Sequence, residues 1–220
     1  MTEPIEDDGS LAEIAPRRTP QQARSKERVD RILDAAAQLL AEEGYNAVKT
    51  NHIAKRAGVS IGSVYQFFPN RFAIFHALAE RYRGRITEVL AEYIGPEANL
   101  DSWEDALDGT IDALAELWRT EWSFFAVWIA IQNTAELREP DDVYKNRILG
   151  ELLLPFYKRI LPKTSETRLA RIAGTVFDIY SLLLDSSMRV GDTQDEATVE
   201  ELRLVVKGYL KQHVELERGT

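Results

Sequence analysis

Residues 46–72 read NAVKTNHIAKRAGVSIGSVYQFFPNRF, and this stretch decides the fold of the N-terminal part of the chain. It predicts two short helices, one capped by Thr50 and running to Ala57, the other capped by Ser60 and running to Phe67. Gly58 stands where the turn between them needs a left-handed backbone. The apolar residues spaced to pack the two helices together are Ile53, Ala54, Ala57, Val59 and Val64. This is the pattern of a helix-turn-helix, whose second helix enters the major groove of DNA.

The predicted outer face of the second helix carries groups that suit DNA. Gly62 lets the backbone approach the duplex closely, and hydroxyls at Ser60, Ser63 and Tyr65 suit phosphates or base edges. The surrounding residues strengthen this interpretation, because they are basic.

Outside this motif the chain also reads as helical, since nothing alternates convincingly with a period of two. Pro140 is expected to lie beyond the end of one helix, and Pro155 to kink or split the next. The further helices expected are residues 19–44, 69–93, 102–119, 122–138, 141–161, 164–190 and 193–218. The predicted fold class is all-α with about nine helices, an N-terminal three-helix DNA-binding domain preceding a larger helical domain.

The charge is divided unevenly along the chain. The 220 residues hold 27 Lys and Arg against 36 Asp and Glu, a net charge of −9 that argues superficially against nucleic acid. Residues 1–15 hold five acids and no base, residues 16–83 have a net charge of +6, and residues 84–220 one of −10. We therefore expect a disordered acidic tail, a DNA-binding domain over 16–83 with a basic arm, and an acidic body over 84–220.

Several classes of function find no support in the sequence. There is no cysteine, and the three histidines are too far apart to suggest a metal site, so neither a metal nor a cofactor is expected. No catalytic constellation is evident, which argues against an enzyme. The longest apolar run is eight residues where a membrane span needs about 20, and residues 1–15 lack the positive start of a signal peptide. We expect a soluble, cytoplasmic protein without a membrane partner.

Residues 24–82 resemble the DNA-binding domain of the TetR family of transcriptional regulators. The stretches that carry the resemblance are ILDAAAQLLAEEGYNAV, IAKRAGVSIGSVYQFFPNR and FHALAER. The resemblance covers under a third of the chain. The remainder agrees with the family only in length, helicity and helix count. It implies a homodimer on a palindromic operator in double-stranded DNA, with a C-terminal domain that binds a small-molecule effector and releases the operator.

The resemblance also places DNA contacts by position. Arg71 occupies the place of a phosphate-contacting lysine, Ile61 would read DNA through an apolar contact such as a thymine methyl, and Gln66 suits adenine. The full set that falls on the family's contact positions is Thr50, Asn51, Ile61, Gly62, Ser63, Tyr65, Gln66 and Arg71. Arg17 and Arg18 precede the first helix, where arginines can enter a narrow minor groove, although a solvated tail explains them equally well.

The larger domain concentrates aromatic and polar residues that would suit a ligand pocket, although each alone is more simply a core residue. The candidate ligand contacts are Trp118, Trp122, Phe125, Trp128, Gln132, Asn133, Tyr144, Phe156, Asp178 and Tyr180. Asp178 could meet a cationic ligand or a partner's arginine, and otherwise water at the helix surface, which is the default. The aromatic residues favour an apolar or aromatic effector, and the acidic body weakly favours a cation.

The last two expected helices are apolar over more than one stripe, which suggests burial on two sides. In the family this pair forms the dimer interface, the alternative being a monomeric core. Alternatives to an effector-released repressor also stay open: control by a protein partner, action as an activator, or a helical enzyme or scaffold that merely contains the motif.

Overall fold

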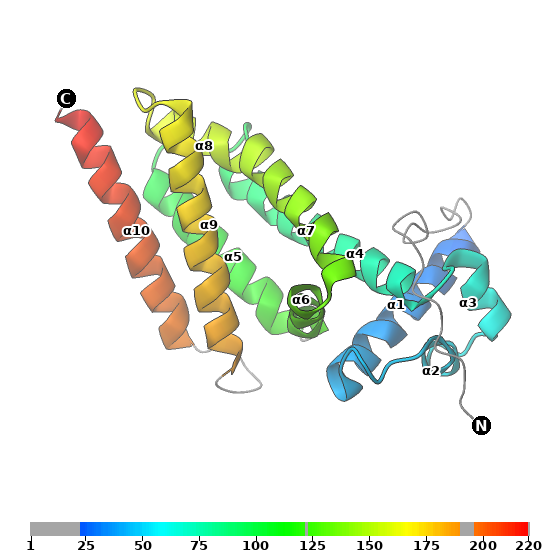
Figure 1. The fold of residues 1–220 in the computed structure, drawn as a ribbon. Coiled ribbons are helices and arrows are strands. Elements are labelled where there is room, and N and C mark those ends of the chain that lie inside the picture. Colours follow the sequence, from blue (N-terminus) through cyan, green and yellow to red (C-terminus); the bar gives the residue numbers. More distant parts are fainter. Residues whose placement is uncertain (1–22, 122, 190–195, 220) are drawn as a thin grey trace. The chain divides into compact units, whose positions relative to one another are not determined.

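The computed structural model describes residues 23–121, 123–189 and 196–219, and all regular structure within these ranges is helical (Figure 1). Taking α7, the π-helical segment η2 and α8 as one interrupted helix gives nine helices in the described ranges, which confirms the all-α prediction. The elements are α1 (Ala23–Glu43), α2 (Thr50–Arg56), α3 (Ile61–Phe67), α4 (Arg71–Ile94), α5 (Trp103–Thr120), α6 (Ser123–Asn133), α7 (Ala135–Ile148), η2 (Leu149–Leu153), α8 (Leu154–Ile160), α9 (Glu166–Arg189) and α10 (Glu196–Arg218). In these ranges no helix is both long enough and apolar enough to span a bilayer.

The chain divides into two compact units. The first comprises the residues up to Tyr82 together with Ser123–Asp141, and the second comprises Arg83–Trp122 together with Asp142–Thr220. The first break falls one residue from the boundary drawn at 83. The structure differs from the sequence-based division over 123–141, because α6 packs on α1 and so joins the first unit.

The first unit has its core on the inner face of α1. Val29 is half-buried, and the buried apolar positions of α1 include Ile32, Leu33, Ala36, Leu39 and Leu40, as the helical spacing predicts. Gly44 follows the helix with a φ of 76°, a left-handed conformation suited to glycine at a helix end.

The boundary between α6 and α7 differs from the prediction. The break expected before Pro140 lies instead at Thr134, and α7 continues through Pro140 as its sixth residue. The N–H of Thr134 closes a tighter turn on the Ile131 carbonyl at 3.4 Å, and the next helix starts from the Thr134 carbonyl, which accepts from Leu137 and Arg138. A proline removes only one backbone donor, so Pro140 does not prevent α7 from beginning at Ala135 and continuing past it.

Pro155 does interrupt its helix, as predicted. It occupies the second position of α8, directly after the five π-helical residues of η2. A proline inside a helical rod lacks the N–H that would bond to the preceding turn, and its ring meets that turn. The wider turn of η2 therefore accommodates Pro155 without ending the rod.

The second unit has one large apolar core, to which α4, α5, α7, η2, α8, α9 and α10 all contribute. Ser102 caps α5 by accepting from the N–H of Asp105 at 3.1 Å, at the start of the helix expected over 102–119. Helices α9 and α10 lie side by side and pack against each other (Figure 1). The expected start of the last helix at residue 193 and the acidic tail over 1–15 lie outside the described residues.

Candidate DNA-binding surface and ligand cavity

The turn between α2 and α3 has the predicted geometry. Gly58 has a φ of 65°, and the N–H of Val59 donates to the Ala54 carbonyl at 3.1 Å, which closes the end of α2. Ile53 and Val64, one from each helix, are completely buried. These contacts fix α3 against α2 and determine which residues of α3 face solvent.

The two predicted caps have different outcomes. Ser60 caps α3, since its Oγ accepts from the N–H of Ser63 at 3.1 Å and lies 2.9 Å from the Ser63 Oγ. The prediction for Thr50 was wrong, because the cap position of α2 is Lys49 and Thr50 is a buried residue of the first turn. Thr50 is therefore part of the buried core of the first unit.

The exposed residues of α3 share one face. Ile61 is 42% exposed and Tyr65 39%, and Gly62 and Gln66 are exposed beside them. Positions one, two, five and six of a helix lie on the same side, because 3.6 residues complete a turn. Ser63 is half-buried, so α3 offers a compact face of four residues, which we call the α3 face.

Two further candidate DNA contacts lie in the first unit. Asn51 is exposed, and its Oδ1 accepts from the N–H of His52 at 2.8 Å. Arg71 is half-buried, with its guanidinium carbon 5.2 Å from the ring centres of both Tyr45 and Phe72, an arrangement that favours a cation over aromatic faces. Arg17 and Arg18 lie outside the described residues.

The basic charge of the first unit is partly neutralised within it. Arg56 makes a two-pronged ion pair with Glu42 at 2.9 and 2.7 Å, and the hydrogen bond from Arg56 holds the pKa of that carboxyl below its usual value. Arg81 pairs with Asp34 at 2.7 Å. Lys49 and Lys55 are exposed and make no ion pair within the described ranges, so their charge is available to a phosphate backbone.

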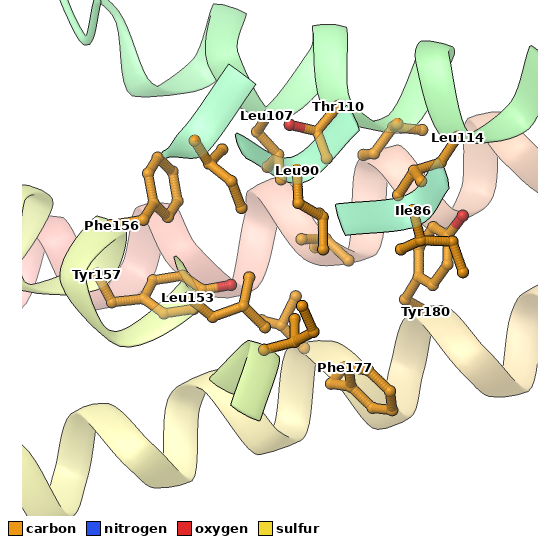
Figure 2. A pocket seen from close by; sticks show the side chains of 15 residues that line it. Ile86, Leu90, Leu107, Thr110, Leu114, Leu153, Phe156, Tyr157, Phe177 and Tyr180 are labelled. Atoms are coloured by element: carbon orange, nitrogen blue, oxygen red, sulfur yellow. The ribbon is translucent and has the colours of Figure 1, made fainter. Parts of the chain in front are cut away.

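The second unit contains an apolar cavity of about 100 Å³ (Figure 2). Ile86 and Leu90 come from α4, Leu107 and Leu114 from α5, and Phe177 from α9. The remaining lining residues are Ile94, Thr110, Ile111, Ile148, Leu153, Phe156, Tyr157, Val176, Tyr180 and Val206. None of the lining side chains is charged.

The cavity brings together only some of the candidate ligand residues. Phe156 and Tyr180 line it, and Trp118 lies beside it, since its indole interacts with the Tyr180 hydroxyl. Tyr144 is buried elsewhere in the second unit, donating to the Arg83 carbonyl at 3.0 Å. Phe125, Trp128, Gln132 and Asn133 belong to α6 in the first unit and are not among the lining residues, and Trp122 lies outside the described residues.

Asp178 lies at the surface, which was its default interpretation. Its side chain is 69% exposed and accepts from the Lys145 ammonium at 2.7 Å. This carboxylate is therefore satisfied by Lys145 and is not among the residues that line the cavity.

The aliphatic residues that make up most of the cavity wall were missed by the sequence analysis, which selected aromatic and polar side chains. The available signal was the apolar stripe of α5, in which Leu107, Ile111 and Leu114 follow helical spacing. Such a stripe identifies a buried face but not a gap in its packing. Within the described ranges no group of three His, Asp or Glu side chains is placed to hold a metal ion.

The first unit thus has the geometry of a helix-turn-helix DNA-binding domain, joined in the chain to a helical unit with an internal apolar cavity. Residues 32–78 match the family model of bacterial regulatory proteins of the tetR family. Residues 101–214 match that of the tetracyclin repressor-like C-terminal domain, which covers over half of the chain.

Individual relatives agree. A solved TetR-family transcriptional regulator from Streptomyces coelicolor is 31% identical, with a TM-score of 0.58, over 84% of this chain and 98% of that one. The nucleoid occlusion factor SlmA of Glaesserella parasuis is 34% identical over 41% of this chain and 44% of its own length. The transcriptional repressor KstR of Rhodococcus jostii is 41% identical over 26% of this chain and 27% of its own. The match thus spans less than half of each of these two curated relatives.

The chain belongs to the TetR family of transcriptional regulators. The family consists of DNA-binding regulators, in which dimerisation and ligand binding are typical.

Proposed function

We propose that this protein is a repressor that binds a palindromic operator as a homodimer and leaves it when a small molecule occupies the cavity of the second unit. The observation that carries the proposal is the α3 face, an exposed set of Ile61, Gly62, Tyr65 and Gln66 on a helix fixed by its buried side. Lys49 and Lys55 supply unpaired positive charge in the same unit. The relative KstR is named a repressor, which supports repression over activation as the proposed function of this protein.

The proposed dimer interface is formed by α9 and α10. These adjacent helices carry large apolar side chains exposed in the single chain, namely Leu182 on α9 and Leu204, Val205 and Leu216 on α10. Exposed apolar side chains gathered on two neighbouring helices are typical of surfaces that a partner covers. A symmetric dimer also supplies two recognition helices for the two half-sites of a palindrome.

Release requires that the effector bind more tightly to the conformation that does not hold DNA, since equal affinity for both would shift nothing. The cavity is the site proposed for this, because it is lined by residues of α4, α5 and α7 to α10, most of them in the part matched by the C-terminal family model. A protein partner in place of a small molecule is the alternative, and the cavity argues for the small molecule.

The test is to select a duplex from random sequence with the full chain and then compare variants in gel retardation. Tyr65→Ala should weaken binding to the selected duplex by about five- to 150-fold, the range expected when a base contact worth about 1–3 kcal/mol is removed. Tyr65→Phe removes only the hydroxyl and separates its contribution from that of the ring. Thermal unfolding confirms that the variants are folded. Selection of no preferred duplex, or wild-type affinity in Tyr65→Ala, would contradict the proposal.

A further inference from the structure

The cavity of the second unit has a wall almost without polar atoms. Its fifteen lining side chains comprise twelve hydrocarbon groups and only three that carry a hydroxyl, and none is charged. The three hydroxyls belong to Thr110, Tyr157 and Tyr180, and what each of them already contacts decides what the cavity offers to a ligand.

Two of the three hydroxyls already have a polar neighbour. Thr110 donates to the Ala106 carbonyl of its own helix at 2.7 Å. Tyr180 lies beside the Trp118 indole, and while burial raises the pKa of the Tyr180 phenol, the interaction with this indole partly opposes the rise. Only the Thr110 hydroxyl makes a hydrogen bond of normal geometry, because the buried Tyr180 hydroxyl makes none within the described ranges despite its indole neighbour.

Tyr157 has neither the backbone acceptor of Thr110 nor the indole neighbour of Tyr180. Its side chain is 1% exposed, and its hydroxyl makes no hydrogen bond to any residue in the described ranges. Figure 2 shows the Tyr157 oxygen pointing inward among the lining side chains. A buried hydroxyl without a partner is costly, since burial removes it from water without replacing the hydrogen bond that water supplied. Tyr157 therefore presents a polar group that a ligand would satisfy.

The electrostatics of the wall exclude one kind of ligand. An ion placed in this cavity would lose its hydration with no opposite charge on the lining to replace it, which costs several kcal/mol. Burial also raises the pKa of the Tyr157 phenol, so that this group stays neutral at physiological pH and remains a hydrogen-bond donor. The acidic charge of the body does not extend to the cavity wall.

The size of the cavity limits the ligand further. An engineered cavity of roughly 150 Å³ lined by Leu, Ile and Phe binds benzene. At about 100 Å³, the present cavity is smaller, so it limits the ligand to about one ring with a single small substituent, which it admits when the surrounding helices move slightly.

We propose that the effector is a compact, uncharged, mainly apolar molecule whose one oxygen accepts a hydrogen bond from Tyr157. This inference rests on the proposed function for the role of the ligand, but the binding chemistry comes from the wall alone. It replaces the weak expectation of a cation drawn from net charge with a neutral ligand.

The experiment uses the full-length protein and four probes built on one ring: benzyl alcohol, toluene, benzoate and benzylammonium. Calorimetry should show benzyl alcohol binding at least about tenfold more tightly than either ion, a ratio of about 1.4 kcal/mol. Tyr157→Phe should weaken benzyl alcohol binding roughly three- to tenfold and leave toluene unchanged. Tyr93→Phe, a half-buried tyrosine of the same unit outside the cavity wall, should change neither. Val176→Phe, which fills the cavity, should abolish binding of both.

The outcomes separate this inference from the proposed function. Benzoate or benzylammonium binding as tightly as benzyl alcohol, no binding of benzyl alcohol, or an unchanged affinity in Tyr157→Phe would each overturn the inference. Retention of the selected duplex is measured in parallel without probes. A charged compound that releases the duplex would preserve the proposed function and contradict the neutral ligand, whereas failure to bind any duplex would contradict the function and leave the cavity result standing.

Discussion

The two glycines of the helix-turn-helix, Gly58 and Gly62, serve different purposes. Gly58 has a φ of 65°, and a Cβ built there would meet nothing within 4 Å, so the demand on this residue comes entirely from the backbone. Gly62 lies within α3 with an ordinary helical φ, and a Cβ there would only approach the Ser60 Oγ at 4.0 Å. The first is required by the turn, and the second leaves open space on the α3 face.

This difference predicts opposite effects of the same substitution. Gly58→Ala should lower the free energy of unfolding by about 1–2 kcal/mol, the cost of a left-handed residue with a Cβ. Gly62→Ala should leave it unchanged or raise it by up to about 1 kcal/mol, as alanine does within helices, while weakening binding to the selected duplex. Urea denaturation and gel retardation measure the two effects. Equal destabilisation by both substitutions would contradict the assignment.

Local chemistry explains which of these residues could be predicted. Gly58 and Ser60 follow from rules that involve only a few neighbours along the chain, and both predictions were confirmed. Thr50 has the right side chain for a cap, but its place in the core was decided by packing from distant residues. The cavity wall could not be predicted for the same reason. Leu90 and Val206 are far apart in the sequence and line the same cavity only once the helices have packed together.

At the scale of elements, α6 shows the same limit. Its sequence is apolar enough to predict a buried helix, yet nothing in it indicated that it packs on α1 rather than within the second unit. In the structure α6 is also joined to α4, since the Tyr82 and Ser123 hydroxyls lie 2.5 Å apart and the Phe124 ring centre lies 4.5 Å from that of Tyr82. A polar contact between buried side chains from separate helices leaves no mark in either local sequence.

The contact between α4 and α6 yields a prediction. Tyr82→Phe should lower the free energy of unfolding by about 1–2 kcal/mol, because it leaves the buried Ser123 hydroxyl without its partner. Ser123→Ala should cost a similar amount, and the double variant should cost clearly less than the sum of the two. Urea denaturation of the four proteins gives the coupling energy. Additive effects would show that the two hydroxyls do not stabilise each other.

The contact between α5 and α10 rests on charge. Asp108 accepts from Arg203 at 3.0 Å and from Lys207 at 2.6 Å. Burial opposes ionisation of Asp108, but the hydrogen bonds from Lys207 and Arg203 outweigh it and hold its pKa below the usual value. A carboxyl with a lowered pKa stabilises the fold above its unfolded pKa of about 3.9, and that contribution is lost as the pH falls toward the folded value.

Asp108→Asn should accordingly lower the free energy of unfolding at neutral pH by roughly 0.5–1 kcal/mol, the order measured for partly exposed ion pairs. The difference from wild type should shrink as the pH falls below about 4, because Asp108 takes up a proton there first in the unfolded chain and only at lower pH in the folded protein. Asp178→Asn, which removes a more exposed pair with Lys145, serves as control and should change stability less. Urea denaturation between neutral and acid pH measures both. A pH-independent difference for Asp108→Asn would contradict this account.

For the whole molecule, the distribution of charge matters more than its sum. A net charge of −9 would repel DNA, but residues 16–83 have a net charge of +6.

Deleting residues 1–23 removes the arginines at 17 and 18 along with the acidic tail. It should weaken binding to the selected duplex and reduce the slope of log affinity against log salt by about 0.9 for each phosphate that the arm no longer neutralises. Deleting only residues 1–15, which removes five acids, is the control and should leave the slope unchanged. An equal slope in all three proteins would show that the basic arm does not bind phosphate.

The proposed dimer provides the last prediction, because it links α9 and α10 to DNA binding. Leu204 on α10 is 64% exposed, and Val143 on α7 is 66% exposed, so the two offer a matched pair of apolar surface residues. Leu204→Glu should place a charge in the proposed interface and convert the dimer to monomers, whereas Val143→Glu should leave it intact. Two linked recognition helices bind a palindrome far more tightly than one, so Leu204→Glu should also weaken operator binding by about 100-fold or more. Sedimentation velocity and gel retardation measure these effects together. A dimer that persists in Leu204→Glu would place the interface elsewhere, and a monomer that keeps full affinity would show that operator binding does not depend on the dimer.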